Sequence, residues 1–444
     1  MKNRFSIIST IAAGLSLVPF LRSKNRDIIT LLWLPKLLAG ATALWLAFIG
    51  VISAIYGWMR RDQRLTMTGM VGAALSMLFI RRVTVGHAGF EKTFGEDWKQ
   101  KIPPAQRTRM QPVRWPVLNI PIQRIPYQKD VLFGTSPATG KPLLADLWLP
   151  PRQNEASGLS VIYIHGGSWR LGSKDVGTRT IFQRLANLGH VVMDIDYTLY
   201  PESLMIDMVR EVKMAVAWLK ENHRALGINP ERVVLMGGSA GAHLALLAGY
   251  TPDSKELGVE GLYPDLSVRG VVAYYPPADF RNLVNDLRSF NIQRSSGHSH
   301  VKFQDTVVRF MNDTLRIASS IRDPNAGPRQ TREQAGMFTD PMKYFNQLIG
   351  GPIDEIPEQY ALVSPAAHVS PDCPPTLLLQ GTDDFFQLLP GVQRLYHSLQ
   401  AAGVPAILVE FPHCEHAFDL ILPQVSPAAQ ASTYDVEHFL AMLT

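Results

Sequence analysis

Residues 127–444 alternate short runs of β-branched and aliphatic residues with longer segments whose apolar positions recur at helical spacing. The short runs predict strands, and the longer segments predict amphipathic helices. Strands are expected near 126–133, 143–149, 160–164, 190–197, 233–236, 268–275, 375–380 and 406–411. Helices are expected near 178–188 and 205–226 and within 425–443. Such alternation favours an α/β fold, with a mostly parallel sheet, an antiparallel pair of strands at its beginning, and helices on both faces.

The predicted α/β pattern is interrupted by a long insertion. About a hundred residues separate the strand ending at Tyr275 from the one beginning near Thr376, more than a plain crossover needs. Apolar residues recur at helical spacing within 302–320. We therefore expect a lid insertion at about 281–340 whose helix covers the substrate pocket. The alternative is a helix that packs against the body of the domain.

Residues 1–88 contain three apolar runs and are predicted to form a membrane-anchoring helical region. The run 37–58 carries no charge, and at about 1.5 Å per residue it would cross a hydrocarbon core of ~30 Å. The run 65–80 is shorter and would close a hairpin with it. The run 7–21 contains Pro19 and fits a third span, an interfacial segment or a signal peptide. The sequence leaves open whether two or three of these runs span the membrane. The alternative is that they are buried helices of a soluble domain.

Charge is divided unevenly along the chain. Residues 1–128 carry 18 lysines and arginines against 5 acidic residues, whereas the remainder carries 25 against 33. Because the basic arm alternates its charges with long apolar runs, a membrane is a better partner for it than nucleic acid. With two spans, the excess of flanking cations places the catalytic domain in the cytoplasm; with three spans the orientation is open. Two cysteines, Cys373 and Cys414, give no disulfide framework and fit a reducing compartment, although a bridge between them is not excluded.

A basic, proline-rich linker is predicted over 89–126 and is expected to stay extended. At its start, Phe90, Phe94 and Trp98 recur every four residues, as they would on one face of a helix. That helix would lie on the bilayer or, equally, pack against the following domain.

The segment 233–243, VVLMGGSAGAH, carries the clearest chemical signal. An apolar run enters a G-x-S-x-G turn and a small-residue helical segment leaves it, which forces Ser239 onto a tight elbow with its hydroxyl exposed. Gly237 and Gly241 flank the serine where a Cβ would not fit. A serine hydroxyl is a weak nucleophile at neutral pH, so it needs a base and an oxyanion site.

The oxyanion site is predicted upstream. The strand at 160–164 runs directly into His165-Gly166-Gly167-Ser168-Trp169. Consecutive glycines after a strand let backbone amides turn toward a developing negative charge. The predicted donors are the amides of Gly166, Gly167 and Ala240, whereas His165 and Trp169 are expected to fix the loop.

The acid and the base are expected after the next two strands, in the order Ser, Asp, His. Asp383 and Asp384 follow the strand at 375–380, and His413 and His416 follow the strand at 406–411. Since parallel strands end at one edge of the sheet, a carboxylate there can orient an imidazole that takes the serine proton. The residues alone leave the choice within each pair open.

These motifs resemble the α/β-hydrolase family, in its esterase/lipase branch of BD-FAE-like and hormone-sensitive-lipase-like carboxylesterases. The resemblance covers roughly 128–444 and rests on segments 165–169, 196–202, 237–243, 360–365 and 381–384. It implies that the acid, three residues after the glycine, is Asp384, and that the base, before a small residue and Phe, is His416. Gln387 and Ser168 depart from the family pattern without touching the triad.

Rival interpretations are weaker. His413, Cys414 and His416 lack the second ligand cluster that a zinc site needs, so no metal and no cofactor are expected. His243 is expected to be packed or hydrogen-bonded, and Asp196 and Glu202 to tie down a loop. The sequence thus predicts a membrane-anchored serine hydrolase that cleaves small-molecule or lipid carboxylic esters. The alternatives are an amidase or formamidase-like hydrolase and a non-catalytic membrane-bound binding protein with the same fold.

Overall fold

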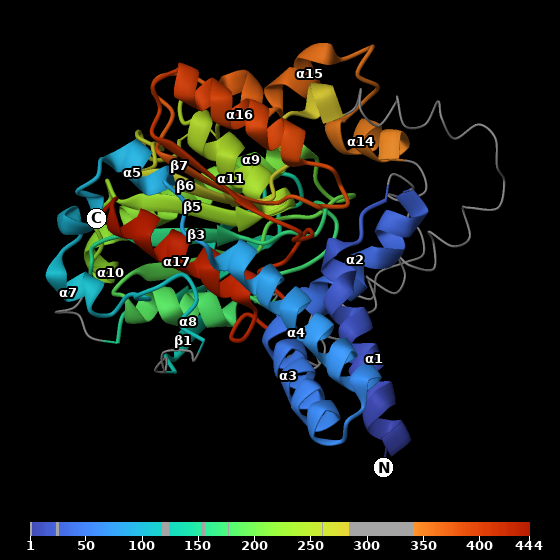
Figure 1. Ribbon diagram of the computed structural model, residues 1–444. Helices are drawn as coiled ribbons and strands as arrows, with labels where there is room; N and C mark the ends of the chain where they lie inside the picture. The colour runs from blue at the N-terminus through green and yellow to red at the C-terminus, as the bar shows by residue number, and fades with distance from the viewer. Residues whose placement is uncertain are drawn as a thin grey trace.

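A twisted eight-stranded sheet forms the centre of the computed structural model, which describes residues 2–23, 26–117, 124–151, 156–175, 177–259, 261–283 and 341–444 (Figure 1). The strand order is β1-β2-β4-β3-β5-β6-β7-β8. The strands are β1 Tyr127–Thr135, β2 Pro142–Trp148, β3 Ser160–Ile164, β4 Val191–Ile195, β5 Val233–Gly238, β6 Gly270–Tyr274, β7 Thr376–Gly381 and β8 Ala406–Phe411. β2 is antiparallel to both of its neighbours, β1 and β4, and β3 to β8 are parallel to one another. The mostly parallel sheet confirms the prediction from the strand pattern, and the whole is the α/β-hydrolase fold that the resemblance of the motifs implied.

Helices cover both faces of the sheet. One core joins strand residues such as Ile162 and Leu235 to α9 (Met205–Glu221), α11 (Ala240–Tyr250) and α16 (Leu389–Ala401). The other joins Val161 and Val234 to α8 (Arg179–Asn187) and α17 (Pro427–Ala441). Shorter helices complete the described body: α10 His223–Leu226, α14 Pro341–Ile349, α15 Pro357–Leu362 and the 3-10 turn η4 Pro365–His368. The central strands are buried on both faces, which explains their nearly continuous apolar runs.

The register of the parallel strands brings their carboxyl ends to one edge. Ile164 pairs with Gly237, Gly238 with Tyr274, Tyr274 with Leu379, and Gly381 with Phe411. The loops after β3, β5, β7 and β8 therefore emerge side by side, and these loops carry every predicted catalytic residue.

The N-terminal helices form a stalk that projects from the hydrolase body (Figure 1). The stalk consists of α1 (Lys2–Leu17), α3 (Ala43–Met59) and α4 (Gln63–Thr84), which pack against one another. The chain enters at the far tip of α1, and the turn between α3 and α4 lies at the same tip. The 3-10 turn η1 (Val18–Phe20) and α2 (Arg26–Ala41) lie between α1 and α3, next to the body.

The predicted span 37–58 is wrong as a single straight helix. The structure ends α2 at Ala41 and begins α3 at Ala43, with a bend of 70° between them. The residues before the break pack on the hydrolase body, where Trp33 and Leu37 are buried. By length and apolar composition, one helix of the described chain, Gln63–Phe94, is able to cross a membrane, and the bent pair α2–α3 would count as a second.

The segment 89–126 is not an extended linker over its described part. It forms the short helices α5 (Gly89–Phe94), α6 (Trp98–Lys101) and α7 (Pro104–Arg107). Phe90 and Trp98 are buried and stack on each other 4.6 Å apart, and Trp98 also lies 5.4 Å from His438 of α17. The aromatic stripe therefore packs against the body rather than lying on a bilayer. The lid insertion is expected at about 281–340, with a helix at 302–320. From residue 284 to residue 340 it lies outside the described residues.

Candidate active site

Ser239 occupies a strained position between β5 and α11. Its φ is 55° and its ψ is −119°, a conformation that costs a non-glycine residue of order 1–3 kcal/mol. The surrounding backbone holds it there, because the Ser239 amide donates to Tyr274 O at 2.9 Å and Ser239 O accepts from the His243 amide at 3.0 Å. The elbow predicted from the sequence is thus present.

The flanking glycines are required by close backbone approach. A Cβ on Gly241 would lie 2.0 Å from the Ile164 carbonyl oxygen, and one on Gly237 would lie 2.5 Å from the Gly241 carbonyl carbon. A Cβ on Gly166 would lie 2.8 Å from Gly238 O and 3.4 Å from Ser239 Cβ. The loop after β3 therefore lies directly against the serine elbow.

The loop after β3 has the features of an oxyanion site. Gly167, Ser168 and Trp169 have φ values of 121°, 54° and 57°, so the chain reverses tightly after the strand. Among the described residues, none accepts a hydrogen bond from the amides of Gly166, Gly167 and Ala240. Free amides beside the serine are what a tetrahedral oxyanion requires.

One member of each predicted couple, Asp384 and His416, forms a close carboxylate–imidazole pair. His416 Nδ1 lies 2.8 Å from Asp384 Oδ2, and both side chains are nearly inaccessible to solvent. The imidazole is enclosed by Tyr275 and Phe386, with ring centroids at 4.3 and 4.7 Å. In the described part of the chain the Ser239 hydroxyl forms no hydrogen bond with His416. Such bonds often tighten only when substrate binds.

Gln380 is a contributor that the sequence reasoning missed. Its Nε2 donates to Asp384 Oδ2 at 2.9 Å, and the Phe386 amide donates to Asp384 Oδ1 at 2.9 Å. Together with His416, these donors fix the carboxylate. Gln380 is fully buried at the end of a leucine run, and a polar residue in that position was the available signal.

Asp383 and His413 lie apart from this pair. Asp383 contacts cations of the N-terminal arm, Lys36 at 2.7 Å and Arg22 at 3.0 Å. His413 Nε2 contacts Arg82 of α4. The structure thus brings Asp384 and His416 together and places Asp383 and His413 against residues of the N-terminal arm.

The remaining singled-out residues have supporting positions. His165 stacks on Tyr197 at 4.4 Å, and burial lowers the pKa of its imidazole. His243 is fully buried, its Nε2 contacts Val363 O at 2.7 Å, and burial lowers its pKa to about 4. Asp196 accepts from the Lys174 amide at 2.6 Å, and Glu202 pairs with Lys141 at 2.6 Å.

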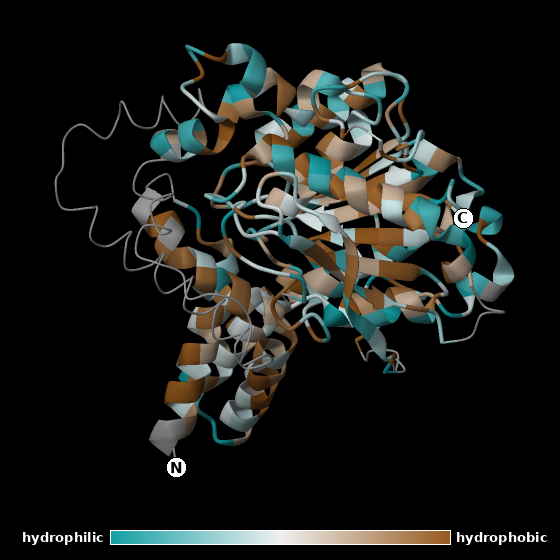
Figure 2. Cartoon of the chain, turned by 180° about the vertical axis from the view of Figure 1, so that it is seen from behind, coloured by the Kyte–Doolittle hydropathy of each residue, from teal (hydrophilic) through white to brown (hydrophobic). Residues whose placement is uncertain are grey.

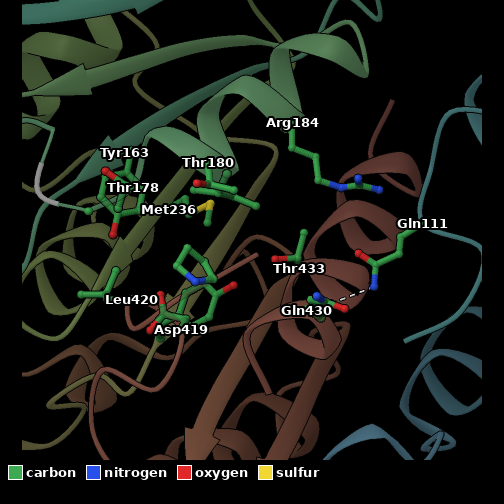
Figure 3. A pocket seen from close by; sticks show the side chains of 14 residues that line it. Gln111, Tyr163, Thr178, Thr180, Arg184, Met236, Asp419, Leu420, Gln430 and Thr433 are labelled. Carbon is green, nitrogen blue, oxygen red and sulfur yellow. Dashed lines mark hydrogen bonds between the residues drawn. The ribbon is translucent and has the colours of Figure 1, made fainter. Parts of the chain in front are cut away.

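Two further features bear on ligand chemistry. A cavity of about 40 Å³ lies between the sheet and α17, where Tyr163 and Met236 face Gln430 and Thr433 (Figure 3). It has room for roughly three waters and contains none of the predicted site residues. Within the described ranges no cluster of His, Cys, Asp and Glu is arranged to hold a metal ion. Cys373 and Cys414 are free and buried.

Comparison with known proteins finds distant similarity to ester hydrolases. The sequence model of the BD-FAE family matches residues 145–314, which include the oxyanion loop and the serine elbow. The chain thus has the α/β-hydrolase fold and is similar in sequence to carboxylic ester hydrolases, of which it spans 57% of the length of the first relative named next.

The individual relatives are distant. The chain is 26% identical to the probable carboxylic ester hydrolase LipM of Mycobacterium tuberculosis, over 67% of this chain and 57% of LipM. It is 24% identical to esterase LipQ of the same organism, over 75% of this chain and 69% of LipQ. It is 27% identical to the isoprenylcysteine alpha-carbonyl methylesterase ICME of Arabidopsis thaliana, over 45% and 44% of the two chains. Among solved structures, Thermogutta terrifontis esterase 2 is similar at 19% identity with a TM-score of 0.49, over 71% of this chain and 93% of that chain.

Proposed function

We propose that this protein is a membrane-anchored serine esterase that hydrolyses carboxylic esters through an acyl-enzyme. The observation that carries the proposal is the Asp384–His416 pair at the sheet edge that also holds the strained Ser239 elbow. Relatives named as ester hydrolases support the reaction type.

The proposed reaction follows from the roles of these groups. His416 Nε2 removes the proton of Ser239 as its Oγ attacks the ester carbonyl, while Asp384 stabilises the imidazolium through Nδ1. The amides of Gly166, Gly167 and Ala240 bind the oxyanion. The tetrahedral intermediate collapses, the alcohol leaves with the proton from His416, and an acyl-serine remains. Water, deprotonated by His416, then attacks this ester and releases the acid.

The test is hydrolysis of p-nitrophenyl esters, from acetyl to long-chain acyl, by the detergent-solubilised full chain. Ser239→Ala is expected to lower kcat by at least ~10⁴-fold, because the triad members act as a unit. Ser254→Ala, a half-buried serine beyond the far end of α11, is the matched control. Turnover that survives Ser239→Ala would refute the mechanism. Activity confined to amides would favour the amidase alternative, and no turnover by folded protein would favour a binding role.

The membrane part of the proposal is supported by the surface of the stalk. Hydrophobic residues recur along the helices of the stalk (Figure 2), and among them Trp45, Phe48 and Ile55 are 56%, 58% and 53% exposed. Contiguous apolar surface of this kind is rare on soluble monomers and marks contact with a partner or membrane.

The interior of the stalk supports the same conclusion. Gly50 and Gly69 face each other so closely that a Cβ on either would lie within 2.7 Å of the other's carbonyl oxygen. Ser76 donates to Ser16 at 2.9 Å across α4 and α1. Small residues and a hydroxyl bond inside, with large apolar residues outside, are typical of helices packed in lipid.

Helix α2 supports an amphiphilic substrate. It lies at 70° to α3, so if α3 crosses the bilayer, α2 lies near the membrane surface. Ile28, Leu31 and Leu38 are exposed along one side of α2, while Trp33 on another side contacts Phe385 beside the predicted acid. The site would then open close to the interface where lipid esters reside. A chain-length optimum at acetyl in the same assay would refute this part.

The side of the membrane is a separate proposal. With α1, α3 and α4 all spanning, flanking cations fall on both sides and do not discriminate. We retain a cytoplasmic catalytic domain, supported by the free Cys373 and Cys414, because a reducing compartment keeps thiols unpaired. Protease protection of a C-terminal tag in sealed vesicles tests it, and a tag protected in spheroplasts but cleaved in inverted vesicles is expected.

A further inference from the structure

We propose that α2 belongs to the catalytic framework and that Lys36 is a positioning residue that holds the acid-bearing and base-bearing loops in register. The inference rests on the proposed roles of Asp384 and His416. It goes beyond anchoring, because it gives a residue of the N-terminal helices a part in the reaction itself.

Lys36 bridges the two loops directly. Its Nζ lies 2.7 Å from Asp383 Oδ2 and 3.4 Å from Glu415 Oε1. These carboxylates belong to the residues immediately before Asp384 and His416. The three side chains are 4%, 5% and 1% exposed, so the cation is buried between both carboxyl groups. A buried pair of this kind is strongly sensitive to loss of one partner.

A second contact from α2 reaches the base itself. Trp33 Nε1 donates to the backbone oxygen of His416 at 3.3 Å, and the indole lies 5.6 Å from Phe385. Trp33 and Lys36 are three residues apart and so lie on the same side of the helix. One face of α2 thus contacts the residues beside the acid and the base.

The two loops are also close to each other, so a shift in one moves the other. The Asp383 amide donates to Cys414 O at 3.0 Å, and a Cβ on Gly381 would lie only 2.4 Å from that same oxygen. Glu415 Oε2 has no hydrogen-bond partner among the described residues. The local charge is therefore balanced chiefly by Lys36, with Arg22 joining Asp383 from an exposed position, 64% accessible.

Electrostatics agree with this geometry. Burial alone would raise the pKa of Asp383, but the hydrogen bond and charge of Lys36, with the charge of Arg22, hold it below its usual value. Burial raises the pKa of Glu415 to about 8, and Lys36 opposes that rise. Without Lys36, Asp383 loses its buried counter-charge beside the catalytic acid.

The experiment compares four single variants, and the double variant Lys36→Met/Asp383→Asn, in the full, detergent-solubilised chain. Lys36→Met removes the charge, Lys36→Arg keeps it, and Asp383→Asn removes its main partner. Lys101→Met is the control, since Lys101 pairs with Asp97 at the surface, where the two are 47% and 59% exposed. The turnover rate on the best ester is divided by the concentration of folded protein, which the thermal unfolding signal measures.

Lys36→Met is expected to lower kcat by roughly 10- to 100-fold, the range for a small misplacement of catalytic groups, with KM within about twofold. Lys36→Arg should recover most of kcat, Lys101→Met should match wild type, and Lys36→Met/Asp383→Asn should lose no more than the worse single variant. A variant whose melting temperature falls while kcat per folded enzyme stays unchanged would overturn the inference. If Lys36→Met does not fold, Asp383→Asn with wild-type kcat would overturn it as well. Wild type without Ser239-dependent turnover would instead refute the proposed function and this inference together.

Discussion

The apolar exterior of the stalk gives opposite predictions for lipid and for water. Phe48 and Ile55 lie seven residues apart on α3, on the same outward side and either side of its centre, and are 58% and 53% exposed. In a membrane they face hydrocarbon, whereas in a soluble protein they face water. Replacing both by aspartate, Phe48→Asp/Ile55→Asp, separates the two cases.

The magnitude follows from the position of the two residues. Near the centre of a spanning helix, Phe or Ile favours insertion by ~0.3–0.6 kcal/mol and Asp opposes it by ~2.5–3.5 kcal/mol. Two substitutions therefore disfavour insertion of α3 by about 6–8 kcal/mol, or roughly 10⁴- to 10⁶-fold in partition. In water, the same exposed substitutions should change stability by only about 0.5 kcal/mol each.

The assay is resistance of the protein to alkaline carbonate extraction from membranes. Wild type is expected to stay with the membrane, and the double variant to be extracted or degraded. Leu422→Asp, which replaces a residue 49% exposed on the hydrolase body, is the matched control and should behave as wild type. Membrane anchoring would be refuted if wild type and the double variant were both soluble without detergent, and the double variant were monomeric and fully active.

Three further predictions concern the hydrolase body. Gly241→Ala should abolish folding or activity, because its Cβ would lie 2.0 Å from a backbone carbonyl oxygen of β3. Gly249→Ala, on the same helix, places its Cβ 2.8 Å from a side-chain methyl of Val271 on β6 and should lower the melting temperature less; equal melting temperatures would contradict this. Arg184→Met removes the cation that pairs with the fully buried Glu437, which keeps its hydrogen bond from the Gln111 amide, and should cost about 3–5 kcal/mol in urea unfolding, most of it recovered by adding Glu437→Gln; an additive double variant would be inconsistent with a buried pair. Burial raises the pKa of Asp419 to about 6, so between pH ~4 and 6 the folded state holds a proton that the unfolded chain has released, and stability is lost as pH rises through 6. Asp419→Asn should remove this loss, about 3 kcal/mol. The melting temperature of the variant should therefore rise relative to that of wild type from pH 4.5 to pH 8; a difference independent of pH would exclude the effect.

The sequence was a good guide to the hydrolase strands and to the loops that follow them. Their signals are local: a five-residue apolar run such as 160–164 must be a buried strand, and glycines around Ser239 are demanded by contacts within one turn. The choice of Asp384 over Asp383 came from resemblance alone, because adjacent carboxylates on one loop are equivalent until the backbone fixes which points toward the imidazole.

The sequence was a poor guide to α2. Hydropathy records that residues 37–58 avoid water, but it does not say whether they meet lipid or protein. The sequence near Thr42 does not predict that the helix ends there. The packing of Trp33 and Leu37 against the body determines where α2 ends. Lys36 immediately precedes the apolar run 37–58 and would flank a span, yet its Nζ is buried against Asp383. A contact between residues 347 positions apart leaves no trace in local periodicity.

The same contacts change the meaning of the charge asymmetry. A basic N-terminal arm beside an acidic remainder was interpreted as a membrane signal, but part of that charge is neutralised inside the molecule. Lys36 lies against Asp383, and Arg114 binds Asp435, fully buried on α17, at 2.6 Å. Buried carboxylates such as these are tolerated only with a buried counter-charge, and here the N-terminal arm supplies it. The hydrolase body therefore depends electrostatically on residues that precede its first strand, and the arm that we propose as a membrane anchor also contacts the loops that carry Asp384 and His416.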